Sequence, residues 1–151
     1  MDSELTELLE TAIYKEIASQ AFYEAGRGTT DDPGARALMS ELAQEEARHV
    51  QILKQLRDSQ WKAGSWHGDQ VPNLMLSEHM TGGDKLDSAS LQETLVFAMM
   101  REQQSVDFYS RMMAVLRDQD AKLLCERLVQ EELRHKLKLE TLYDELFYQE
   151  N

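Results

Sequence analysis

The chain has 151 residues, a formal net charge of −12 and a single cysteine, Cys125. Its length suits one domain, and its negative charge disfavours nucleic acid and anionic membranes as partners, because both would repel it. A lone cysteine excludes an internal disulfide and a Cys-x-x-Cys metal site. With no signal-peptide pattern and no apolar run of about 20 residues, we expect a cytoplasmic protein without a membrane span.

Two helices are predicted in the first part of the chain, where apolar residues recur at helical spacing. The first helix begins near Ser3 and ends at Gly26. Asp32 and Pro33 then supply an N-cap followed by proline at the first helical position, which opens the second helix. We expect these two helices to form a hairpin over residues 3–62.

The helical pattern breaks at residues 63–87, where glycines and a proline predict a connection that is long for a compact domain. Helical spacing resumes at Ser90-Leu91-Gln92-Glu93, a capping box that opens a third helix. Either Asp118 or Asp120 is placed to cap a fourth helix. The third and fourth helices are expected to form a second hairpin over residues 88–148.

The predicted fold class is all-α, a four-helix bundle with one long crossover between its second and third helices. Such a crossover lets those two helices run parallel, whereas a bundle of alternating directions needs only a short link there. We therefore expect two helical hairpins in a single domain over residues 1–151.

An internal repeat relates the two hairpins, because unusual polar residues recur at one constant offset. Glu102 lies 86 residues after Glu16, and every other matched pair has the same separation. A common offset indicates that the two hairpins were duplicated as one unit. The matched pairs include Glu16 and Glu102, Ser19 and Ser105, Tyr23 and Tyr109, Glu46 and Glu132, and His49 and His135.

Six of the repeated polar residues occupy positions that the helical period assigns to the core. They are Glu16, Glu46, His49, Glu102, Glu132 and His135. Buried carboxylates without partners are costly, and several together repel one another, so bound cations are the natural counter-charge. Each Glu-x-x-His pair places both side chains on one helix face. These six residues are therefore the candidate ligands of two metal ions.

The expected roles follow from the positions of the carboxylates. Glu16 and Glu102 would each supply a terminal ligand to one ion. Glu46 and Glu132 would be free to bridge the two ions. Four carboxylates with two imidazoles suit iron or manganese, since the set is too rich in oxygen for copper and has no thiolate for structural zinc.

Several neighbours of the candidate ligands have more than one interpretation. Tyr23 and Tyr109 are core aromatics, hydrogen-bond donors to ligand carboxylates, or redox-active phenols beside the metals. Glu45 and Glu131 lie about 100° around the helix from the bridging carboxylates. We interpret them as surface charges, with contacts to the ligands as the alternative.

The chain resembles the ferritin-like superfamily and, within it, the rubrerythrin family more than ferritin, which would lack the second Glu-x-x-His histidine. The resemblance implies two iron ions and reduction of hydrogen peroxide or O2 by two-electron oxidation of the iron pair. In that reaction the four ligand glutamates and the two tyrosines would serve catalysis. The motifs that carry the resemblance are Glu16 with Phe22-Tyr23, Glu45-Glu46-Ala47-Arg48-His49, Glu102 with Phe108-Tyr109, and Glu131-Glu132-Leu133-Arg134-His135.

Two departures from typical rubrerythrins bear on function. They carry a rubredoxin domain with four cysteines, which this chain lacks, so a separate electron-donor protein is implied. They also tend to carry an extra glutamate where this chain has Ser105. The alternatives are a ferroxidase or an iron storage or delivery protein of ferritin type, and a bundle that binds another divalent metal or none. A homodimer or larger homo-oligomer is expected.

Overall fold

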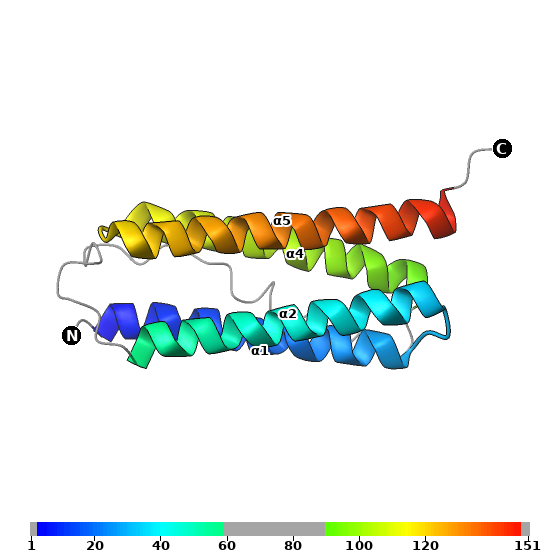
Figure 1. The fold of residues 1–151 in the computed structure, drawn as a ribbon, viewed down its shortest axis with the longest axis horizontal. Coiled ribbons are helices and arrows are strands. Elements are labelled where there is room, and N and C mark those ends of the chain that lie inside the picture. The colour runs from blue at the N-terminus through cyan, green and yellow to red at the C-terminus, as the bar shows by residue number, and fades with distance from the viewer. Residues whose placement is uncertain (1–2, 59–89, 149–151) are drawn as a thin grey trace.

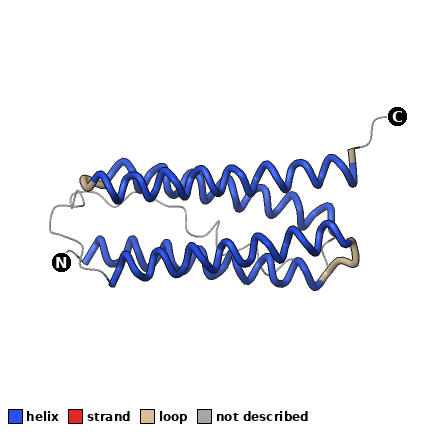
Figure 2. The backbone as a smooth tube through the Cα atoms, in the orientation of Figure 1, coloured by secondary structure: helices blue, strands red, loops and turns tan. Residues whose placement is uncertain are grey.

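The computed structural model describes residues 3–58 and 90–148, and these ranges contain four helices and no strand (Figures 1 and 2). The predicted crossover over residues 63–87 lies outside the described residues. None of the described helices has both the length and the apolarity that crossing a membrane requires. The four helices are α1 (Ser3–Gly28), α2 (Pro33–Asp58), α4 (Leu91–Val115) and α5 (Gln119–Phe147).

The helices form two antiparallel hairpins that lie side by side. α1 packs chiefly against α2, and α4 packs chiefly against α5 (Figure 1). α2 and α4 run in the same direction, so the end of one and the start of the other lie at opposite ends of the bundle (Figure 1). The predicted four-helix bundle with parallel second and third helices is therefore confirmed.

The helix starts depend on the side chains that the sequence singled out. Asp32 accepts a hydrogen bond from the backbone N–H of Ala35 at 2.9 Å. Asp118 accepts the equivalent bond from Ala121, also at 2.9 Å. Ser90 caps α4 in the predicted manner. Each cap satisfies a backbone donor that the first turn leaves without a partner, and Asp118 rather than Asp120 is the cap of α5.

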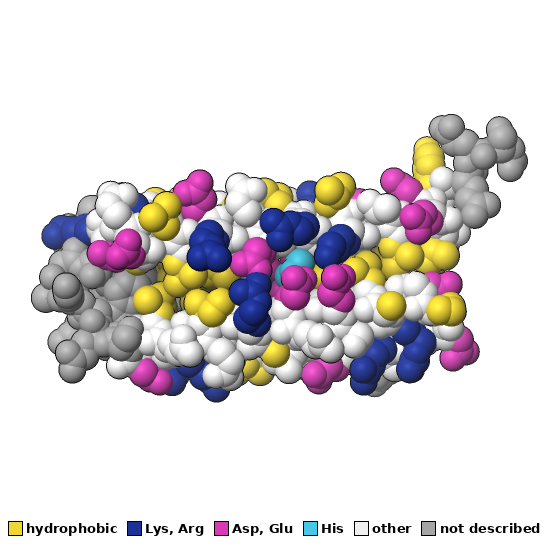
Figure 3. Space-filling model, viewed as in Figure 1, with side chains coloured by type: hydrophobic (Ala, Val, Ile, Leu, Met, Phe, Trp, Pro, Cys, Tyr) yellow, Lys and Arg dark blue, Asp and Glu magenta, His cyan; other side chains and the backbone are white. Residues whose placement is uncertain are grey.

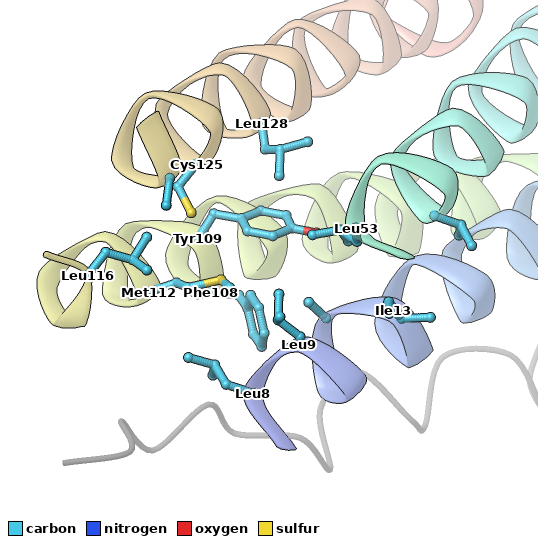
Figure 4. Close-up of a cluster of buried hydrophobic side chains, with 13 residues drawn as sticks. Leu8, Leu9, Ile13, Leu53, Phe108, Tyr109, Met112, Leu116, Cys125 and Leu128 are labelled. Atoms are coloured by element: carbon cyan, nitrogen blue, oxygen red, sulfur yellow. The ribbon is translucent and has the colours of Figure 1, made fainter. Parts of the chain in front are cut away.

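The core consists of two apolar clusters with a polar layer between them. One cluster gathers side chains from the start of α1, the end of α2, the end of α4 and the start of α5 (Figure 4). The other gathers side chains from the opposite ends of the same helices. Along every helix, the candidate metal ligands fall between the residues of the two clusters. Apolar packing at both ends thus isolates the polar layer from solvent.

Candidate metal centre

Six buried side chains from all four helices meet in the polar layer. Each of the six is at most 2% exposed. The cluster brings together all of the candidate ligands: Glu16 from α1, Glu46 and His49 from α2, Glu102 from α4, and Glu132 and His135 from α5.

The six side chains form two overlapping groups of ligand atoms. In each group, one atom from every member lies within 4.8 Å of the others. The two groups share Glu46 and Glu132. Sharing of this kind is what two neighbouring cations bridged by carboxylates would require. The members of the first group are Glu16, Glu46, His49 and Glu132, and those of the second are Glu46, Glu102, Glu132 and His135.

Most ligand atoms at the centre of the cluster have no hydrogen-bond partner. Buried polar atoms without partners are rare in folded proteins and cost free energy. A concentration of such atoms in one place fits a bound cation, and carboxylate oxygens with imidazole nitrogens are ligands that iron and manganese accept. The atoms are Glu16 Oε2, both carboxylate oxygens of Glu46 and of Glu132, Glu102 Oε2, and the Nδ1 atoms of His49 and His135.

The two histidines present the same ring nitrogen to the cluster. His49 Nδ1 lies 3.5 Å from Glu16 Oε2 and 3.5 Å from Glu132 Oε1. His135 Nδ1 lies 3.3 Å from Glu102 Oε2 and 3.3 Å from Glu132 Oε1. The imidazole rings are nearly parallel, with centroids 6.0 Å apart. The Nδ1 atoms are therefore the candidate donors to a metal.

The opposite nitrogen of each histidine faces a glutamate from the other hairpin. His49 Nε2 lies 3.4 Å from Glu131 Oε1, and His135 Nε2 lies 2.7 Å from Glu45 Oε2. The interpretation of Glu45 and Glu131 as surface charges is therefore wrong. A carboxylate beside Nε2 favours the ring orientation in which Nδ1 faces the cluster. Arg48 in turn pairs with Glu131.

The two tyrosines each hold a carboxylate from the opposite hairpin. Tyr23 donates a hydrogen bond to Glu102 Oε1 at 2.6 Å. Tyr109 donates to Glu16 Oε1 at 2.5 Å. Both phenol side chains are fully buried, and burial beside the carboxylates raises the pKa of each well above its usual value. The phenols are therefore neutral donors, as the second of the three interpretations expected.

Burial and charge act strongly on the ionisable groups of the cluster. Burial and the neighbouring carboxylates, Glu132 foremost, raise the pKa of Glu46 well above its usual value. Burial also pushes the pKa of Glu16 upward, but Lys15 and the hydrogen bonds around it hold that pKa well below the usual range. Hydrogen bonds to carboxylates outweigh burial at the histidines and raise the pKa of His49 to about 10 and of His135 to about 11.

Two buried cations that the sequence pattern did not single out flank the cluster. Lys15 is 1% exposed and Arg101 is 5% exposed. Arg101 lies 86 residues after Lys15, so the internal repeat could have revealed the pair. Each cation reaches a serine of the other hairpin, because Lys15 donates to Ser105 and Arg101 donates to Ser19.

The fold and the buried carboxylates and imidazoles together indicate the class of protein, a four-helix bundle with a candidate metal site between its two hairpins. The family model for rubrerythrin matches residues 7–143 of the chain. The chain therefore belongs to the rubrerythrin family, as its motifs indicated. No curated protein matches it.

Two solved structures share the fold. A hypothetical protein from Pyrococcus furiosus has a TM-score of 0.69 and 21% identity, over 93% of this chain and 88% of that one. A two-domain protein from Anabaena variabilis, with DJ-1/ThiJ/PfpI-like and ferritin-like domains, has a TM-score of 0.73 and 17% identity. That match covers 99% of this chain and 42% of the Anabaena protein. The ferritin-like fold predicted from the sequence is confirmed.

Proposed function

We propose that the chain is a non-haem di-iron protein that reduces hydrogen peroxide, or O2, by two-electron oxidation of a carboxylate-bridged iron pair. The observation that carries this proposal is the pair of overlapping ligand groups that share Glu46 and Glu132. Two ions held this close could supply two electrons to one oxidant. The rubrerythrin family model supports the same class of chemistry.

The proposed ligands are the six residues of the cluster. Glu16 and His49 would complete the site of one ion, and Glu102 and His135 would complete that of the other. The second half of the repeat thus supplies the same ligand types as the first. Manganese or another divalent ion suits the same donors, so metal analysis of protein purified without added metal identifies the native ion.

The surrounding residues would prepare the site without binding the metals. Tyr23 and Tyr109 fix one oxygen of each terminal carboxylate and leave the other oxygen facing the cluster. Glu45 and Glu131 orient the two histidines. The apolar clusters on either side keep bulk water away, which strengthens every electrostatic interaction within the site.

The proposal is tested by anaerobic iron loading followed by parallel exposure to peroxide and to O2. We expect the ferric absorbance to rise much faster with peroxide, and the variant Glu46→Ala to lose both iron and the reaction. Glu140→Ala, which removes an exposed carboxylate of α5, is the matched control. A faster reaction with O2 would favour a ferroxidase, and an unchanged Glu46→Ala variant would refute the proposed site.

The electrons would come from a separate donor protein, and one face of the bundle suits an acidic donor. Lys and Arg side chains gather with acidic side chains over the middle of α2 and α5 (Figure 3). A surface hollow of about 550 Å³ there is lined by Arg48, Arg127, Arg134 and Glu131, among others. The hollow is adjacent to His49, because Glu131 contacts that histidine.

The positive charge of Arg127 is not repeated on the other half of the bundle. Arg127 and Arg134 are exposed and have no acidic partner within the described ranges. The repeat places Glu41 at the position equivalent to Arg127, and Glu41 pairs with Lys138 at 3.0 Å. An acidic donor would therefore be attracted to the side of His49 on a molecule that is otherwise strongly negative.

A further inference from the structure

Lys15 and Arg101 immediately precede the terminal carboxylates Glu16 and Glu102 in the sequence. Both cations are buried, although lysine and arginine are seldom fully buried without a specific partner. The same internal repeat that relates the candidate ligands relates these two cations. A charge that recurs at one position in both halves, against the cost of burial, calls for a role in the site between them.

The contacts of Lys15 place its charge beside the cluster. Its Nζ atom lies 3.6 Å from Glu16 Oε1 and donates a hydrogen bond to Ser105. The same atom lies over the rings of Phe108 and Tyr109, 5.7 and 5.2 Å from their centroids. Aromatic faces stabilise a cation without neutralising it. The Lys15 Nζ atom therefore lies in a setting lined by aromatic rings, next to a proposed ligand.

Arg101 contacts the equivalent serine and phenylalanine from the other hairpin. Its Nη2 atom donates to Ser19 at 3.4 Å, and its guanidinium lies over the ring of Phe22, 5.0 Å from the centroid. Arginine stays protonated in proteins. Each cation thus extends from its own helix, α1 or α4, to the other of the two. These are the helices that carry the terminal carboxylates.

What these two residues add beyond a hydrogen bond is charge. A glutamine could also donate to a serine, but it would carry no charge. Four carboxylates and two divalent ions together are neutral, and each buried cation adds one positive charge to the surroundings of the loaded site. Positive charge near a metal disfavours its oxidised form, because oxidation adds a further positive charge in a region of low dielectric.

We propose that Lys15 and Arg101 are positioning residues that raise the reduction potential of the iron pair, by placing two buried positive charges beside the ligand cluster. The inference rests on the proposed function, since it takes iron as the metal. It goes beyond that function by explaining how the oxidised pair is brought within reach of an external donor. The ferrous state, which the reaction must regenerate, is the state these charges favour.

The test is the midpoint potential of the iron-loaded full chain in a mediated redox titration. Lys15→Gln and Arg101→Gln each remove one charge while keeping a hydrogen-bond donor. At an effective dielectric constant of about 20, one charge within about 10 Å changes the ferric-to-ferrous ratio on the order of tenfold. For a one-electron step this lowers the potential by about 59 mV.

Charge-conserving variants separate charge from geometry. Lys15→Arg and Arg101→Lys place in each half the cation that the other half already uses, so their potentials should stay near that of the wild type. Lys138→Gln removes the same unit of charge from a surface ion pair with Glu41 and should leave the potential unchanged. Ser105→Ala removes the hydrogen-bond acceptor of Lys15 but keeps the cation, so it should shift the potential less than Lys15→Gln.

The outcomes distinguish this inference from the proposed function. A wild-type protein that binds no iron would refute the function. If the wild-type protein shows an iron couple and both glutamine variants have the same midpoint potential as the wild type, only this inference is overturned. Equal shifts in the charge-removing and charge-conserving variants would also overturn it, because geometry would then be the cause. If both glutamine variants fail to load iron, the cations hold the site together and do not tune it, which equally contradicts the proposal.

Discussion

At the scale of single residues, the candidate site is organised by contacts that cross from one hairpin to the other. Each tyrosine donates to a terminal carboxylate of the opposite hairpin, and each histidine contacts a glutamate of the opposite hairpin. Removing one such contact therefore affects the geometry of a ligand without removing the ligand. This property allows the roles of the neighbouring residues to be tested separately from metal binding.

Replacing Tyr109 by phenylalanine should slow the reaction while iron is retained. The change removes the donor to Glu16, and loss of such a contact to a ligand typically costs 10–100-fold in affinity or activity. We expect about a tenfold lower rate with peroxide in stopped-flow measurements. Tyr143→Phe, which removes a surface hydroxyl hydrogen-bonded to Gln92, should react at the wild-type rate. A wild-type rate in Tyr109→Phe would show that this hydrogen bond has no part in the reaction.

The raised histidine pKa values predict how the stability of the metal-free protein depends on pH. In the metal-free fold the pKa is about 10 for His49 and about 11 for His135, against an unfolded value of about 6.5. Because the folded pKa values are higher, protonation of the rings stabilises the fold fully below about pH 6.5. This stabilisation is lost as the pH rises toward 10. The melting temperature of the metal-free protein should therefore fall between pH 7 and pH 10.

The metal-loaded protein is the control for this prediction. Ligation requires neutral imidazole, so metal uptake at pH 7 should release protons, which a pH indicator detects in weak buffer. A metal-free melting temperature that does not change between pH 7 and pH 10, or metal uptake without proton release, would contradict the protonation of the two histidines.

The residues that the sequence predicted and those that it missed differ in one physical respect. Six ligands were predicted because a carboxylate or imidazole at a core position has few explanations. Lys15 and Arg101 were missed although they obey the same repeat, since long cationic side chains more often reach solvent from such positions. The contacts of Glu45 and Glu131 depend on how the two hairpins face each other, which helical spacing within one helix does not specify.

At the scale of helices, the repeat extends to the way the second helix of each hairpin begins. Asp32 and Asp118 cap α2 and α5 with the same bond at the same distance. Both helices carry a Glu-x-x-His pair, so each cap fixes the start of a helix that supplies two proposed ligands. Capping was predictable because it depends on residues adjacent in sequence.

Replacing Asp118 by alanine should destabilise the protein by about 1 kcal/mol, the usual cost of losing an N-cap. For a chain of this length that lowers the melting temperature by about 2–4 °C, which differential scanning calorimetry resolves. Asp120→Ala removes an acidic residue from the same first turn, without removing the cap, and should cost less. An equal loss in the two variants would indicate that the helix dipole rather than the cap is responsible.

At the scale of the whole molecule, a symmetric interior lies beneath an asymmetric surface. The candidate ligands, the tyrosines and the buried cations follow the repeat, whereas the exposed Arg127 has Glu41 as its counterpart. The four-helix architecture was predictable from periodicity and from one long connection. The surface asymmetry was not, because a hollow over α2 and α5 requires knowing which exposed residues lie together.

Reversing the charge at Arg127 should slow electron transfer from an acidic donor. Reduced plant-type ferredoxin serves as an acidic one-electron donor. We expect it to reduce the oxidised iron of the Arg127→Glu variant several-fold more slowly than that of the wild type at low salt. The difference should shrink at high salt, where charges are screened. Arg27→Glu, an equal change at an exposed position on α1, should have no such effect. Equal rates in the two variants would argue against docking over His49.

We propose that Glu46 and Glu132 would be shared by two metal ions held between the hairpins. Electron paramagnetic resonance of the iron-loaded protein, reduced by one electron, tests this sharing, because bridging carboxylates couple the spins of two iron ions strongly. We predict a spin-coupled mixed-valent signal from the wild-type protein. A spectrum of isolated ferric iron, with no coupled signal, would contradict the shared site.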